Sequence, residues 1–238
     1  MAIMEKVETH RSRLRYFYVT MLREPMLRFI SEYRHVQRGA NWPQQHMCNG
    51  RMPTAEEILS CHDTDGWENV TLDAFLACES NNAFNRQTRM LADLPLSGCY
   101  ERGAMTATER YRVMLASAKR NLDNLAFFGL AEQQELTQFL FEQTFKLRFT
   151  VAFAQTNGSS WRMGVTQAQS DRVRAGNALD TELYRHAESV FAERVAATKA
   201  RFPAAYERFM KKVNASDASR RGSRAKASYT EPREGKLY

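Results

Sequence analysis

The segment from Tyr16 to Trp42 constrains the fold more than any other stretch of the chain. Residues 16–22 are aromatic, β-branched or apolar, and they include no glycine or proline, which is typical of a buried strand. Pro25 then interrupts the strand pattern, and proline is favoured in the first turn of a helix. We therefore predict a strand that runs directly into a helix.

The residues after Pro25 follow a helical period up to Gly39, and glycine commonly ends a helix. The residues that we expect on the inner face are Met26, Phe29, Ile30, Tyr33 and Val36. The residues that we expect on the outer face are Arg28, Ser31, Glu32, Arg34, His35 and Arg38. The predicted helix is therefore amphipathic, with a basic outer face.

A turn between a strand and a helix N-terminus is favourable for an anion, because free backbone N–H groups and the helix dipole point at it. Arg23 lies in this turn, and a guanidinium can hold a phosphate through two parallel hydrogen bonds. On the pattern alone, an ordinary amphipathic helix with a solvated basic face is the simpler interpretation.

Length and charge set wide limits on function. A chain of 238 residues suits one domain, or one domain with tails. A net charge of +7 indicates affinity for polyanions, which include nucleic acids, sulfated glycans and anionic membrane surfaces. No apolar run reaches the roughly 18 residues that a membrane-spanning helix needs, and residues 1–14 lack the apolar region of a signal peptide.

The cysteines leave the redox compartment open. They are Cys48, Cys61, Cys78 and Cys99. They do not form the close CxxC pairs of a zinc site, and they fit either free thiols in the cytosol or disulfides with any of three connectivities. Sequons for N-glycosylation, which are compatible with a secretory route, begin at Asn69, Asn157 and Asn214.

A series of sequence blocks resembles the heparan sulfate 6-O-sulfotransferases in order and in spacing. The first blocks are Arg23-Glu24-Pro25, Ser31-Glu32 and Arg34-His35-Val36-Gln37-Arg38-Gly39-Ala40. Later blocks include His46-Met47-Cys48, Asn85-Arg86-Gln87, Arg89-Met90-Leu91-Ala92-Asp93, Gly98-Cys99-Tyr100, and the stretches 126–130 and 137–142. Arg-Glu-Pro alone is a weak signal, whereas the ordered series, which runs to about Tyr184, is specific.

The resemblance implies an α/β, P-loop-like sulfotransferase fold, in which helices flank a parallel sheet that is incomplete at the N-terminus. The corresponding organisation is a polar segment at 1–14, the C-terminal part of a sulfotransferase domain at 15–205, and a basic tail at 206–238 that we expect to be disordered. Within the domain we expect helices at 71–78, 82–93, 106–122, 132–145 and 180–201, strands at 125–130 and 147–153, and a loop at 155–174.

The resemblance also implies an enzyme that transfers sulfate from 3′-phosphoadenylyl sulfate to the 6-hydroxyl of glucosamine in heparan sulfate, without a metal. By motif position, Arg23 and Ser31 hold the 3′-phosphate of the donor. A second donor segment falls on Ala154, Gln155, Thr156, Arg162 and Met163. The glycan would meet His35 and Trp42, which without the resemblance are a surface histidine and a loop anchor.

No residue of this sequence is assigned as the catalytic base. The family's lysine-bearing, glycine-rich loop for the 5′-phosphosulfate and its catalytic histidine find no match, so the isolated chain is expected to be truncated and inactive. A non-catalytic relative that binds heparan sulfate or another polyanion is therefore the alternative. No motif for binding nucleic acid accompanies the charge.

The resemblance places the protein at the Golgi membrane on its lumenal side, held by an anchor that this sequence does not contain, and it favours disulfides. The basic residues suited to a sulfated glycan are Arg28, Arg34, Arg38, Arg51, Arg86 and Arg89.

Overall fold

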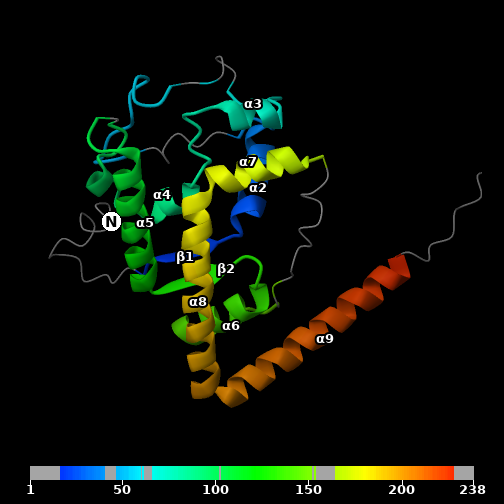
Figure 1. Cartoon of the computed structure of the whole chain (residues 1–238). Helices are drawn as coiled ribbons and strands as arrows, with labels where there is room; N and C mark the ends of the chain where they lie inside the picture. The colour runs from blue at the N-terminus through cyan, green and yellow to red at the C-terminus, as the bar shows by residue number, and fades with distance from the viewer. Residues whose placement is uncertain are drawn as a thin grey trace, which may run out of the picture. The chain divides into compact units, whose positions relative to one another are not determined.

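The computed structural model describes residues 17–40, 47–59, 61, 66–101, 103–151, 153 and 164–227, with side chains as far as residue 216. In chain order the elements are β1 (Val19–Leu22), α2 (Pro25–Val36), α3 (Leu72–Ala77), α4 (Arg86–Leu91), η2 (Leu94–Ser97), α5 (Ala107–Asn124), β2 (Phe127–Leu130), α6 (Gln134–Phe145), α7 (Gln167–Gly176), α8 (Ala178–Arg201) and α9 (Pro203–Ala227) (Figure 1). The chain forms two compact units, 1–132 with 156–192 and 133–155 with 193–238.

The first unit contains a parallel pair of strands, which confirms the predicted α/β arrangement. β1 pairs with β2 from Val19 opposite Phe127 to Leu22 opposite Leu130. Parallel strands require a long crossover connection, and here α2, α3, α4, η2 and α5 lie between them in the chain. β2 is buried along its whole length, which fits the apolar run that predicted it.

β1 is shorter and more exposed than the sequence predicts. The strand begins at Val19, and the side chains of Val19 and Met21 are about half exposed. Only Leu22, at its end, is buried. The prediction of a fully buried strand over 16–22 is therefore wrong for the described residues, in which β1 has β2 as its only neighbouring strand.

The helix α2 begins at Pro25, as predicted, and its inner face anchors the core of the first unit. The ring of Phe29 is fully buried and stacks on Phe84 with centroids 4.9 Å apart, while Phe75 of α3 lies 5.4 Å away. Gly39 follows the helix with a φ of +87°, a conformation that glycine adopts without strain. The buried members of this cluster are Met26, Phe29, Ile30, Val36, Leu72, Phe75, Leu76, Ala83 and Val173.

Side-chain caps define the starts of several helices. Thr71 accepts a hydrogen bond from the backbone N–H of Ala74 at the start of α3, and Thr106 accepts one from Glu109 at the start of α5. Both contacts satisfy amides that a helix N-terminus leaves without an internal partner. The predicted helices at 71–78 and 106–122 are confirmed.

The predicted loop at 155–174 is wrong in its last part, because α7 begins at Gln167. Thr166 and Gln169 form a reciprocal capping box, in which each side chain accepts the backbone N–H of the other residue. Val173 is the one apolar side chain of α7 that is buried, so the helix lacks the periodic apolar pattern that would have revealed it.

The second unit has a small core of its own between α6 and α9. Phe139 of α6 is fully buried and packs against Phe209 and Val213 of α9. The expectation of a disordered tail from residue 206 is therefore wrong as far as Ala227, where α9 ends. Phe209 and Val213 are four residues apart and form an apolar stripe inside a mostly polar sequence, which composition alone conceals.

The strand predicted at 147–153 is absent from residues 147–151 and 153. Two side chains of α6 take up backbone groups that strand pairing would have used. The N–H of Phe149 donates to the carboxylate of Glu142 at 3.0 Å, and the N–H of Phe153 donates to the amide oxygen of Gln138 at 2.7 Å. Both acceptor side chains are buried, so this segment is held to α6 by side chains and not by a neighbouring strand.

All four cysteines are paired. Cys48 is bonded to Cys99, and Cys61 is bonded to Cys78. These bonds resolve the three connectivities that the sequence left open. Among the helices described, none combines the length and apolar character needed to cross a lipid bilayer.

The two disulfides should contribute unequally to stability. They close loops with sequence separations of 51 and 17 residues, and a longer loop removes more entropy from the unfolded chain. Loss of Cys48–Cys99 by double alanine substitution should lower the free energy of unfolding by about 4 kcal/mol, and loss of Cys61–Cys78 by about 3 kcal/mol. Urea unfolding measures both values. A larger loss from the shorter loop would contradict this order.

Candidate functional site at the carboxyl edge of the sheet

The Arg-Glu-Pro turn lies where the two parallel strands end. Arg23 and Glu24 follow β1, and Ala131 and Glu132 follow β2. The N–H of Ala131 donates to the carbonyl of Leu22 at 2.8 Å, so the two chain segments remain side by side beyond the strands. Ligands of open α/β sheets bind at this carboxyl edge, which makes the turn the candidate site.

The backbone of Arg23 is fixed by one side chain. The amide oxygen of Gln87 accepts the N–H of Arg23 at 2.8 Å, and the amide nitrogen of Gln87 donates to the carbonyl of Arg23 at 2.9 Å. Gln87 lies on α4 and is buried. This two-point contact replaces a strand partner and sets the position of the turn.

The guanidinium of Arg23 is only partly engaged. Its Nε lies 3.9 Å from Oε1 of Glu132, and 37% of the side chain is exposed. Within the described part of the chain, the terminal nitrogens of Arg23 have no hydrogen-bond partner. They can therefore donate two parallel hydrogen bonds to a phosphate, as the sequence predicts.

The first turn of α2 does not offer free N–H groups to an anion. The carboxylate of Glu24 accepts the N–H of Met26 at 3.1 Å and that of Leu27 at 2.8 Å. Pro25 has no N–H, and Arg28 donates its own to the carbonyl of Glu24. The expected anion site made of backbone amides is thus wrong in this structure.

Ser31 and His35 lie one helical turn apart on α2, so they share a face. His35 is exposed, and its Nδ1 lies 3.3 Å from Nη2 of Arg38. The structure thus brings His35 together with a cation, one turn after Ser31. Six predicted site residues lie outside the described residues, namely Trp42, Ala154, Gln155, Thr156, Arg162 and Met163.

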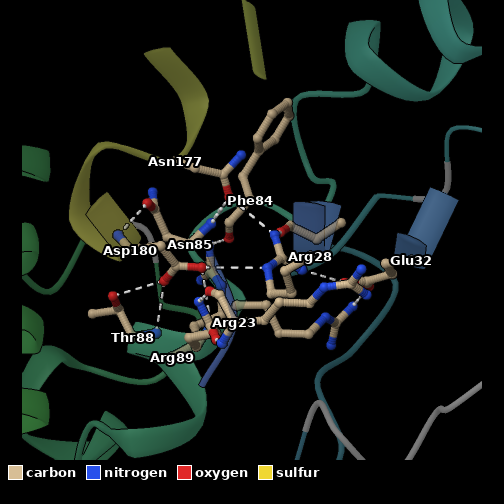
Figure 2. A network of polar contacts seen from close by, with 12 residues as sticks. Arg23, Arg28, Glu32, Phe84, Asn85, Thr88, Arg89, Asn177 and Asp180 are labelled. Carbon is tan, nitrogen blue, oxygen red and sulfur yellow. Dashed lines mark hydrogen bonds and ion pairs between the residues drawn. The ribbon is translucent and has the colours of Figure 1, made fainter. Parts of the chain in front are cut away.

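Arg28 and Glu32 lie in the interior, which corrects their predicted place on the outer face of α2. Arg28 donates to the carbonyl of Ala83 and, at 3.0 Å, to the side-chain oxygen of Asn177, and it forms an ion pair with Glu32 (Figure 2). Burial lowers the pKa of the Arg28 guanidinium, and the carboxylates of Glu32 and Asp180 oppose that shift.

Half of the six predicted glycan-binding arginines, namely Arg28, Arg86 and Arg89, are engaged inside the protein. Arg86 forms an ion pair with Glu32, and Arg51 forms one with Glu57 at 2.7 Å. Arg89 donates to the carbonyl of Phe84 at 3.5 Å, and burial lowers its pKa. With Arg28, three of the six arginines proposed for a basic surface have internal partners, whereas Arg51 pairs with Glu57 at the surface, where 55% of its side chain is exposed.

Asp180 and Asn85 cap each other's helices (Figure 2). The fully buried carboxylate of Asp180 accepts the N–H and the hydroxyl of Thr88, both at 2.8 Å, and the N–H of Gln87 at 3.2 Å. The side-chain oxygen of Asn85 accepts the N–H of Leu179 at 2.9 Å and of Asp180 at 3.2 Å. Asp180 therefore positions Gln87, which in turn fixes Arg23.

Sequence reasoning assigned no role to Asp180, Gln87 or Glu132. Gln87 belongs to the matched block Asn85-Arg86-Gln87, and this was the one signal that could have indicated it. Asp180 was predicted only as the start of a helix, because its partners are far away in the chain. In the region that the structure covers, no group of histidine, cysteine or acidic residues could hold a metal ion.

Comparison with known proteins decides the family. A model described as "Sulfotransferase family" matches residues 3–187, which is most of the chain. The chain belongs to the sulfotransferase family. The small parallel sheet and the Arg-Glu-Pro turn of this sulfotransferase agree with that membership.

Its curated relatives include heparan-sulfate 6-O-sulfotransferases, which confirms the resemblance. The chain is 48% identical to heparan-sulfate 6-O-sulfotransferase 3-B of Danio rerio over 196 residues, which are 81% of this chain and 46% of the relative. It is 46% identical to heparan-sulfate 6-O-sulfotransferase 3 of Homo sapiens over 203 residues, 83% of this chain and 43% of the relative. It is 46% identical to heparan-sulfate 6-O-sulfotransferase 1 of Mus musculus over 188 residues, which are 77% of this chain and 45% of the relative. The chain therefore spans less than half the length of these relatives.

Replacement of Asp180 by alanine should destabilise the protein strongly. The substitution removes the acceptor of three hydrogen bonds and one of the carboxylates that balance the charge of the buried Arg28. Removing one partner of a buried ion pair typically lowers the free energy of unfolding by about 3–5 kcal/mol. Asp171→Ala is the matched control, because Asp171 is exposed and pairs with Arg174 on the same helix. The control should change the free energy of unfolding by less than about 0.5 kcal/mol. Equal effects in chemical denaturation would contradict the capping role.

Proposed function

We propose that this sulfotransferase transfers sulfate from 3′-phosphoadenylyl sulfate to the 6-hydroxyl of glucosamine in heparan sulfate. The observation that carries the proposal is the half-exposed guanidinium of Arg23, in a turn fixed at the carboxyl edge of the sheet. The similarity to relatives that are named for this activity supports it.

Arg23 and Ser31 are proposed to hold the 3′-phosphate of the donor. The site fits such a group, because the outer nitrogens of Arg23 have no partner in the described residues and form a planar pair of donors. Glu24 occupies the amides of α2, so the phosphate is held by side chains. When bound, the donor supplies an activated sulfuryl group for transfer to a hydroxyl.

The acceptor glycan is proposed to pass over the outer face of α2. His35 is exposed there beside Arg38, and together they offer a polar ring and a cation to a sulfated or carboxylated sugar. Trp42 is proposed to stack on a sugar. The proposed second donor segment comprises Ala154, Gln155, Thr156, Arg162 and Met163.

The location and organisation of the protein belong to the same proposal. The pairing of all four cysteines suits an oxidising compartment, in agreement with the lumenal side of the Golgi membrane. We propose residues 15–205 as the sulfotransferase domain, preceded by a polar segment.

A non-catalytic polyanion-binding relative is the second candidate. Arg34 and Arg38 on one side of α2 favour it, because a cationic helix face attracts a sulfated chain. The internal partners of Arg28 and Arg86 weaken it, since these cations are not available to a glycan.

Arg23→Ala should weaken the binding of adenosine 3′,5′-bisphosphate by about tenfold or more, because hydrogen bonds to charged groups contribute roughly 1.5–3 kcal/mol. Isothermal titration calorimetry measures the affinity. Arg112→Ala is the matched control, since Arg112 is exposed and pairs only with Glu109 one turn away. Unchanged affinity in a folded Arg23→Ala protein would remove Arg23 from the site.

The activity is tested by incubating the protein with 3′-phosphoadenylyl sulfate and desulfated heparan, followed by disaccharide analysis. The proposed function predicts new 6-O-sulfate, and this product would overturn the sequence-based expectation that the isolated chain is inactive. Retention on heparin without product and without nucleotide binding would favour the second candidate. Sulfate at another position would contradict the proposed acceptor.

A further inference from the structure

We propose that Glu132 is a positioning residue that aims the guanidinium of Arg23 at the donor's phosphate. This inference rests on the proposed function, because it presupposes that Arg23 meets that phosphate. Glu132 lies two residues beyond β2, at the position that matches Glu24 beyond β1. Its carboxylate therefore lies beside the Arg-Glu-Pro turn, at the same edge of the sheet.

Both oxygens of Glu132 are held by groups other than Arg23. Oε1 accepts the N–H of Glu24 at 3.2 Å, and Oε2 accepts the hydroxyl of Tyr184 at 2.7 Å. One anchor comes from the turn itself and the other from α8. The carboxylate thus has a fixed position whether or not Arg23 approaches it.

Glu132 contacts Arg23 at Nε, the nitrogen that joins the guanidinium to the side-chain stem, which we call the inner edge of the guanidinium. Nε of Arg23 lies 3.9 Å from Oε1 of Glu132, which restrains the side chain and leaves the terminal nitrogens to a ligand. An arginine that binds a phosphate loses rotamer freedom, and this loss opposes binding. A fixed carboxylate on the inner edge reduces the loss, because it limits the orientations of the free side chain.

The contact is too exposed to matter much for folding. Arg23 and Glu132 have 37% and 28% of their side chains exposed, and ion pairs of this kind contribute little to stability. The effect of Glu132 should therefore appear in ligand binding and not in unfolding. This difference separates positioning from a structural role.

Tyr184 keeps the carboxylate in place through a hydroxyl that stays protonated. Burial raises the pKa of Tyr184, and the hydrogen bond to Glu132 raises it further. The phenol is therefore a donor at neutral pH. Tyr184→Phe removes this donor and keeps the ring.

The test is a double-mutant cycle on the binding of adenosine 3′,5′-bisphosphate, measured by calorimetry. Glu132→Gln keeps the size of the side chain and an oxygen for the N–H of Glu24, but it removes the charge. It should weaken binding about threefold to tenfold in the protein with Arg23, and less than about twofold in the Arg23→Ala protein. Tyr184→Phe should weaken binding in the same direction by a smaller factor, and it is the second variant should Glu132→Gln fail to fold.

The control is Glu182→Gln, which removes an exposed acidic charge of α8 that pairs with Lys119 and Arg185. It should leave the affinity within about twofold, and the unfolding midpoint in urea should be unchanged for both glutamine variants. The inference would be overturned if Glu132→Gln weakened nucleotide binding equally in the proteins with Arg23 and with Arg23→Ala, or if it strengthened nucleotide binding. Failure of the proposed function is distinguishable, because Arg23→Ala would then leave nucleotide affinity unchanged.

Discussion

The buried carboxylate of Asp180 is the constraint on which the candidate site depends. Burying a charge away from water costs free energy unless the charge is paired and hydrogen-bonded. Asp180 meets both conditions, because it accepts three hydrogen bonds from α4 and lies 3.5 Å from the guanidinium of Arg28. These contacts fix the start of α4. Because Gln87 lies in that first turn and binds both backbone groups of Arg23, the carboxylate of one helix determines where the Arg-Glu-Pro turn stands.

Around that turn, the carboxylates of Glu24 and Glu132 have structural roles, and the guanidinium of Arg23 has the proposed ligand-binding role. Glu24 satisfies the amides of α2, which would otherwise attract an anion, and Glu132 lies on the inner edge of the Arg23 guanidinium. In the proposed site, the outer nitrogens of the partly exposed Arg23 hold the phosphate together with Ser31. Such a site favours an anion with two adjacent acceptor oxygens over a simple negative charge, since the planar arginine fork matches two phosphate oxygens in geometry.

The sequence predicted those features that depend on neighbouring residues, and it did not predict those that depend on partners far away in the chain. The strand, Pro25 and the period of α2 follow from neighbouring residues, and all three were predicted. Arg28 and Glu32 have the spacing of a solvated ion pair, and their burial depends on partners far along the chain, such as Asn177 and Asp180. Likewise α7 has a single buried apolar residue, and the apolar stripe of α9 is hidden among charges. The role of Gln87 arises from its contacts with Arg23 and Asp180, and that of Glu132 from the pairing between β1 and β2, and no local pattern encodes either.

The most direct test of the central claim is a crystal structure of the protein with adenosine 3′,5′-bisphosphate. The account predicts that the 3′-phosphate contacts the terminal nitrogens of Arg23, while Glu24 still caps α2 and Gln87 still holds the backbone of Arg23. A phosphate bound to the amides of α2 with Glu24 displaced, or a nucleotide remote from the carboxyl edge of the sheet, would contradict it.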